Sequence, residues 1–130
     1  MTIPNKKDLE RLERYIRDFK NLHAISASNY ISNLRNIIES YPLKKVKKQL
    51  EVFKAVEKFN RFKILILLNE KDKMCTCEII GILNLSQSNV SHHLQILERA
   101  ELITNFTQGK WKFYKITEKG KKIIQFILDL

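Results

Sequence analysis

A set of short, uncharged polar side chains lies between residues 86 and 99: Gln87, Ser88, Ser91, His92 and Gln95. Ser86 suits a helix N-cap, and Val90, Leu94 and Leu97 recur at spacings of four and three, which predicts a helix with one apolar stripe. The polar groups can donate to and accept from base edges, while the helix N-terminus attracts phosphate. We interpret this segment as a DNA recognition helix. On its own it would also fit an amphipathic surface helix with a polar face.

The neighbouring segments favour the first interpretation. A short helix is predicted over residues 77–83, followed by the tight connection Asn84-Leu85, which is the spacing of a helix-turn-helix. Two strand-like runs, 102–107 and 110–116, then flank Gln108-Gly109 and predict a β-hairpin. A hairpin after a helix-turn-helix is a wing, so the sequence predicts a winged helix-turn-helix.

The charge balance points to a polyanionic partner. The chain has 24 Lys and Arg against 14 Asp and Glu, a net charge of +10 and a pI near 9.7. Such a balance suits nucleic acid or an anionic membrane surface. The longest apolar run, Ile64 to Leu68, is far too short to span a bilayer. We therefore expect no membrane insertion.

The compartment is predicted from the cysteines and the N-terminus. Cys75 and Cys77 are one residue apart, which is not the pattern of a disulfide framework. The N-terminal residues contain no apolar secretion signal. Both observations indicate a reducing cytoplasm.

The first 41 residues predict an antiparallel helical hairpin. One helix is expected over residues 5–24, capped by Asn5, and a second follows Ser26-Ala27-Ser28 and ends at Tyr41, before Pro42. This segment is nearly neutral, and +8 of the +10 net charge lies beyond it. We predict a helical extension at 1–41 and a DNA-binding and dimerisation domain at 42–130, in a mainly α, α+β fold.

Three further helices complete that domain. One is predicted over residues 43–59, and Asn60 is expected to cap a central helix over 61–68 that is apolar on nearly every side. Thr117 is expected to cap the last helix, 118–130. Its apolar face needs a partner, either the core or a second copy of the chain.

Several segments resemble the ArsR/SmtB family of dimeric winged-helix transcriptional regulators. They are Arg61–Leu65, Met74–Glu78, Ser86–Leu94 and Gln108–Trp111, with Tyr114. Most members of that family are repressors released by metals or metalloids. The resemblance covers about residues 43–130 and leaves the role of the N-terminal hairpin open.

The resemblance implies a homodimer formed through the helices at 43–59 and 118–130. Two recognition helices would enter successive major grooves of a palindromic operator in double-stranded DNA, about one helical turn apart. The base-reading side chains would be Gln87, Ser88, Ser91 and His92, with Gln95 on the same face. Lys110 and Lys112 of the wing would contact phosphate or the minor groove.

Five nearby residues are not expected to read bases or to contact phosphate as strongly. His93 falls on the side of Val90 and Leu97, so we expect a packed, hydrogen-bonded core histidine and no metal site at the histidine pair. Trp111 and Phe113 are expected to pack against the body of the domain. Phe106 and Thr107 stand where relatives often have Arg or Lys, so the wing is expected to bind DNA more weakly or through Lys110 alone.

The resemblance also makes Cys75 and Cys77 a candidate sensor, because arsenic-sensing members bind As(III) or Sb(III) through a C-x-C at this place. A helix N-terminus lowers a thiol pKa, and soft ions prefer sulfur. Trigonal As(III) favours three thiolates, however, and the chain has only two cysteines. Zn, Cd and Pb sensing are not expected, because the N-terminal cysteines and the last-helix histidines of those sites are absent.

Other functions stay open at this point. Thiol oxidation at Cys75 and Cys77 is one alternative input, and a structural pair with no metal input is another. A constitutive architectural DNA-binding protein is a third possibility. No cofactor is required by any of these. An enzyme is not expected, because the sequence has neither a glycine-rich phosphate loop nor a credible nucleophile with its base.

Overall fold

The structure, a computed structural model, describes residues 2–20 and 26–130. It contains two compact units, Met1–Lys45 and Val46–Leu130. None of the helices in the described residues is long and apolar enough to cross a membrane. The division lies inside helix α3 (Leu43–Val56), slightly beyond the boundary predicted at Pro42.

The first unit is a pair of contacting helices, α1 (Lys6–Tyr15) and α2 (Ala27–Glu39). A π-helical turn, η1 (Ile16–Lys20), extends α1. The predicted N-caps are confirmed, since Asn5 Oδ1 accepts from the Asp8 amide at 2.9 Å and Ser26 Oγ from the Asn29 amide at 3.2 Å. The last part of the predicted first helix, residues 21–24, lies outside the described residues.

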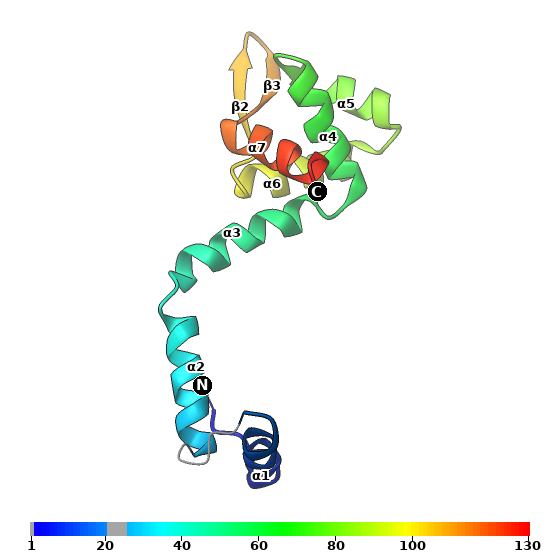
Figure 1. Cartoon of the computed structure of the whole chain (residues 1–130). Helices are drawn as coiled ribbons and strands as arrows, with labels where there is room; N and C mark the ends of the chain where they lie inside the picture. Colours follow the sequence, from blue (N-terminus) through cyan, green and yellow to red (C-terminus); the bar gives the residue numbers. More distant parts are fainter. Residues whose placement is uncertain (1, 21–25) are drawn as a thin grey trace. The chain divides into compact units, whose positions relative to one another are not determined.

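The second unit is a winged helix-turn-helix, as predicted (Figure 1). After α3 its elements are α4 (Phe59–Glu70), β1 (Met74–Cys75), α5 (Thr76–Leu83), α6 (Gln87–Arg99), β2 (Ile103–Gln108), β3 (Trp111–Ile116) and α7 (Glu118–Leu128). The strands form an antiparallel sheet of order β1-β3-β2. Strand β1 was not predicted, because two residues are too few to show a periodic pattern.

Helix α4 is the centre of this unit, in contact with α6, α7 and β3. Ile64, Leu65 and Leu68 are at most 1% exposed, which confirms the predicted buried helix in part. Ile66 is nevertheless 40% exposed, because the neighbouring elements do not surround the helix completely. The predicted cap is wrong: the helix starts earlier, with Lys58 at the N-cap and no side-chain cap hydrogen bond.

The turn of the helix-turn-helix depends on Asn84. This residue ends α5 in the left-handed conformation, with φ of 53°. Asparagine tolerates that conformation better than most residues with a side chain. The chain then reaches Ser86, the N-cap of α6, so a local preference sets where the recognition helix begins.

The end of α6 carries a second left-handed residue, Glu101, with φ of 62°. The amide of Leu102 donates to the Leu97 carbonyl at 3.0 Å, and the Glu101 amide donates to the Glu98 carbonyl at 2.9 Å. These two bonds satisfy the last carbonyls of the helix, as in a Schellman motif. The chain is thereby turned directly into β2 and the wing.

Helix α7 closes the core from the other side. Its predicted cap is confirmed, since Thr117 Oγ1 accepts from the Gly120 amide at 3.0 Å. A Cβ added at Gly120 would lie only 2.4 Å from the Leu102 carbonyl oxygen. Glycine is therefore needed there for α7 to approach the turn between α6 and β2.

Candidate nucleic-acid interface

The recognition helix α6 is anchored by its apolar stripe. Val90, Leu94 and Leu97 are at most 1% exposed, as the spacing predicted. Ser86 Oγ accepts from the Asn89 amide at 3.1 Å and caps the first turn. The helix therefore has a fixed start and one fixed buried face, so its opposite face is presented outward.

That outward face contains the side chains predicted to read bases. Gln87, Ser88, His92 and Gln95 are exposed, and Ser91 is half-buried. The Ser88 hydroxyl lies 3.2 Å from Ser86 Oγ, so it also takes part in the capping group. The structure thus places all five on an accessible surface, and their contact with bases stays a prediction.

The wing is tied to this helix. Asn105 Nδ2 on β2 donates to Glu98 Oε2 on α6 at 2.6 Å. Lys110 lies in the turn between β2 and β3, and Lys112 lies on β3; both are exposed. Two predicted phosphate-contacting cations therefore belong to a hairpin whose base is bonded to the recognition helix.

Lys73 is a further cation of the wing that sequence reasoning missed. It belongs to a charged loop that indicated only a solvated turn, but its Nζ donates to Gln108 Oε1. The same Nζ lies 4.5 Å from the ring centroid of Phe113. Phe113 in turn stacks on Phe106 with 5.6 Å between centroids. The wing thus carries a lysine that its own aromatic pair holds in place.

The prediction that Trp111 packs against the body is wrong. Its side chain is 60% exposed, whereas Phe113 is half-buried and Tyr114 is 6% exposed. Trp111 pairs with Gln108 in the last register position before the turn. Helices α5 and α6 approach this end of the hairpin without burying the indole.

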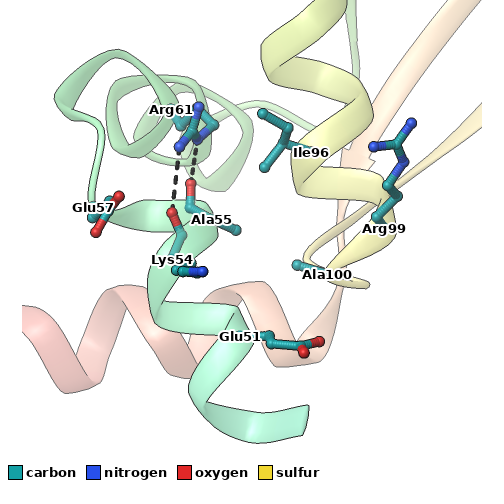
Figure 2. A pocket seen from close by; sticks show the side chains of 8 residues that line it. All are labelled: Glu51, Lys54, Ala55, Glu57, Arg61, Ile96, Arg99 and Ala100. Atoms are coloured by element: carbon teal, nitrogen blue, oxygen red, sulfur yellow. Dashed lines mark hydrogen bonds between the residues drawn. The ribbon is translucent and has the colours of Figure 1, made fainter. Parts of the chain in front are cut away.

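Behind the recognition helix, Arg61 joins α3 to α4. It is a buried cation, 6% exposed, and its Nε and Nη2 donate to the carbonyls of Ala55 at 2.5 Å and Lys54 at 3.3 Å (Figure 2). Those carbonyls lie at the C-terminal end of α3, where no helical partner is available. Arg61 therefore satisfies the end of one helix from the start of the next.

The third nitrogen of the guanidinium reaches the recognition helix. Arg61 Nη1 donates to His93 Nδ1 at 3.4 Å, which requires that nitrogen to be unprotonated. Burial, then the charges of Arg61 and of His92, lower the pKa of His93 below its ordinary value of 6.5. The predicted hydrogen bond is confirmed, although His93 is half-buried instead of lying in the core.

A hollow of about 350 Å³ opens beside Arg61. Figure 2 shows that Ile96, Arg99 and Ala100 contribute one side of it from α6, and Glu51 the facing side from α3. These residues lie toward the C-terminal end of α6, away from Gln87 and Ser88. The hollow is therefore no part of the predicted base-reading surface.

The two cysteines lie where β1 meets α5. Cys75 is 8% exposed and pairs with Phe113 in the sheet, and Cys77 is exposed. Glu78 Oε1 accepts from the Cys75 amide at 3.0 Å, which fixes the start of α5. Of the two sensor candidates, Cys75 is thus in direct register with the wing, and Cys77 lies in the first turn of α5.

The sequence left open whether Cys75 and Cys77 are oxidised, and in the structure their sulfur atoms are paired at disulfide distance. The extended backbone of Cys75 brings the two Cα atoms to 5.4 Å, within the range that a disulfide spans. In the described residues, no group of three or more His, Cys, Asp or Glu side chains is arranged to hold a metal ion. A metalloid site is not shown.

The chain is similar to known transcriptional regulators. Residues 60–105 match the family described as "Bacterial regulatory protein, arsR family". An HTH-type transcriptional regulator of Methanocaldococcus jannaschii is 39% identical over 89 residues, which cover 68% of this chain and 100% of that protein. The chain belongs to the ArsR family.

Two further similarities agree with this assignment. The arsenical resistance operon repressor of Bacillus subtilis is 35% identical over 74 residues, covering 57% of this chain and 70% of the repressor. A homodimeric winged helix-turn-helix DNA-binding domain from Mycobacterium bovis has a TM-score of 0.62 at 21% identity, covering 66% of this chain and 80% of that domain. The second similarity concerns the fold alone. This ArsR-family chain therefore carries the winged-helix fold of transcriptional regulators.

Proposed function

We propose that this ArsR-family chain is a homodimeric repressor that binds a palindromic DNA operator in the cytoplasm. The observation that carries the proposal is the outward face of α6, with Gln87, His92 and Gln95 exposed beside a wing that presents Lys110 and Lys112. Uncharged hydrogen-bonding groups on a rigid helix can discriminate bases, and the lysines supply phosphate contacts.

The dimer is proposed from apolar surface that the second unit leaves uncovered. Leu50 on α3 is 59% exposed and Phe126 on α7 is 52% exposed. Phe53 and Phe126 contact each other edge to face at 5.8 Å, so the two helices contribute to one apolar surface. A second copy of the chain would bury this surface and place two recognition helices on one face of the duplex.

Quantitative footprinting on the DNA upstream of the chain's own gene tests the proposal. We expect one protected palindrome, with affinity that falls steeply as the salt concentration rises, because counterions are released from phosphate. Combining Gln87→Ala with His92→Ala should remove the sequence preference and leave weak non-specific binding. Asn69→Ala, an exposed amide on α4, is the matched control. Unchanged preference in the double variant would exclude α6 as the base-reading element.

The input signal is proposed to act at Cys75 and Cys77. The first candidate is As(III) or Sb(III), which would require both thiols in reduced form and a third thiolate from outside the chain. The names of relatives such as the Bacillus subtilis repressor support this candidate. Binding at the start of α5 would change how α6 docks, because α5 and α6 are in contact.

The disulfide between the two cysteines favours a second candidate, a thiol redox input. Exchange with a small disulfide such as oxidised glutathione would join Cys75 and Cys77 and release two molecules of the reduced thiol. Arsenite and oxidised glutathione can be titrated separately against the protein–operator complex of the wild type, Cys75→Ser and Cys77→Ser. Release by one reagent in the wild type alone identifies the input. Equal release from all three proteins would exclude the cysteines.

A further inference from the structure

A second hollow, of about 330 Å³, lies between the wing and the start of the recognition helix. Trp111 and Lys112 line it from β3, and Gln87 lines it from the first turn of α6. Cys77 and Ile80 of α5 also line it, together with Cys75 and Thr76. The hollow therefore lies between the two elements that contact DNA in the proposed function.

The chemistry of this hollow suits a polyanion with apolar sugar surfaces. None of the described residues that line it is an Asp or a Glu, and Lys112 contributes a cation. Gln87 is at the N-terminal end of α6, where backbone amides and the helix dipole favour a phosphate. Trp111 and Ile80 contribute apolar surface.

Trp111 stands apart from the other aromatic residues of the wing. Phe106 and Phe113 stack on each other, and Tyr114 is buried against the core. Trp111 alone of the described wing aromatics is more than half exposed, at 60%. An exposed indole between two lysines, Lys110 and Lys112, has the composition of a nucleic-acid contact.

We propose that this hollow, which we call the backbone seat, holds one stretch of the DNA sugar–phosphate backbone. The Trp111 ring packs against a deoxyribose, and Lys112 and the α6 N-terminus meet the adjacent phosphates. The inference rests on the proposed function. Cys77 is exposed and lines the seat, so once its bond to Cys75 is reduced, a bulky group on its sulfur occupies the space of the DNA strand. Blocking is then direct and needs no reorientation of α6.

Operator binding by the full-length protein, measured at several salt concentrations, separates the contribution of Trp111 from that of Lys112. Trp111→Ala should weaken operator binding about tenfold through loss of the apolar contact with the sugar, with the slope of log affinity against log salt unchanged. Lys112→Ala should reduce that slope by about one. Trp111→Phe, which retains a ring, should restore most of the affinity. Wild-type affinity in Trp111→Ala would overturn the inference.

Alkylation of Cys77 gives an independent test. In the Cys75→Ser variant the only thiol is Cys77, and operator DNA should slow its reaction with N-ethylmaleimide more than tenfold. Prior alkylation should abolish operator binding, whereas the smaller methylthio group from methyl methanethiosulfonate should weaken binding less. Cys77→Ser, treated identically, is the control. If Cys77 reacts with N-ethylmaleimide as fast in the protein–operator complex as in the free protein, the proposed backbone seat is wrong.

A further measurement distinguishes failure of the backbone seat from failure of the proposed repressor function. Trp111 is the only tryptophan in the chain, so its fluorescence reports its own environment. Operator binding seen by footprinting without a change in that fluorescence rejects the seat and leaves the repressor. Absence of any operator footprint rejects the repressor itself.

Discussion

The two units of this protein differ in how completely they bury their apolar residues. In the described part of the N-terminal hairpin only Ile16 and Ala27 are buried. Phe19 is 76% exposed and Ile37 is 55% exposed. In the winged-helix unit one continuous core runs from Val52 to Ile124.

The difference shows what an amphipathic pattern can and cannot specify. Helices in both units carry apolar residues at spacings of three and four, but two helices cannot enclose each other. In the second unit α4 is covered by α6, α7 and a strand, so most of its apolar side chains are fully buried. We therefore expect stability to reside mainly in the winged helix, as the following variants test.

The largest contrast is expected between two leucines. Leu65 on α4 is fully buried and Leu34 on α2 is 45% exposed. Leu65→Ala should lower the free energy of unfolding by about 2–5 kcal/mol, through lost burial and the cavity left behind. Leu34→Ala should cost less than about 1 kcal/mol. Urea unfolding measures both, and equal losses would show that the hairpin has a core of comparable quality.

A slightly smaller effect is expected for the buried cation. Arg61→Met keeps the length of the side chain but leaves the carbonyls of Lys54 and Ala55 without their donor. The expected loss of stability is about 2 kcal/mol, the cost of leaving buried acceptors unpaired. Lys63→Met, at an exposed position of the same helix, should be close to neutral. A neutral Arg61→Met would mean that water replaces the guanidinium.

Two glycines test how tightly the second unit is packed from place to place. Gly120→Ala should destabilise by about 1–3 kcal/mol, because its Cβ would meet the Leu102 carbonyl and Ile116. Gly81→Ala, in α5 with no atom within 4 Å of the added Cβ, should instead stabilise by about 0.5–1 kcal/mol. Thermal unfolding of the two variants shows whether each substitution lowers or raises the stability relative to the wild type. A stabilising Gly120→Ala would contradict the close approach of α7.

The smallest effect is the pH dependence due to His93. Its pKa is lowered in the folded chain, so the unfolded chain binds more protons once the pH falls below about 6.5. The contribution of His93 to the free energy of unfolding should therefore be fully present above that pH. It should decline as the pH drops toward the folded pKa and then level off. Comparing urea midpoints of wild type and His93→Gln between pH 7.5 and 5.5 isolates this contribution. An identical decline in both proteins would show that groups other than His93 cause the pH dependence of stability.

Much of the fold was predictable because its signals are local. Ser86 and Thr117 are caps that act within one turn, and the spacing of Val90, Leu94 and Leu97 is set by helix geometry alone. The tight connection at Asn84-Leu85 is another local signal, although the left-handed conformation of Asn84 was not predicted. These features indicated the winged helix before any contact was known.

The features that were missed depend on contacts between distant residues. Lys73 reaches Gln108 and Phe113 across the sheet, and strand β1 exists only because β3 lies beside it. Trp111 was misplaced because alternation along a strand does not show which of its side chains the neighbouring helices bury. The disulfide between Cys75 and Cys77 depends on the extended backbone at the end of β1.

The sequence by itself determined the order of the elements and the polar face of α6, because short-range spacing encodes them, and its motifs carried the resemblance to the ArsR/SmtB family. Only the tertiary structure decided which residues share a surface. The side chains of Trp111 and Cys77 and the first residue of the recognition helix, Gln87, line one hollow. The physical reason is that burial and exposure depend on which elements cover a residue. That covering is a property of the whole packed unit and not of neighbours along the chain.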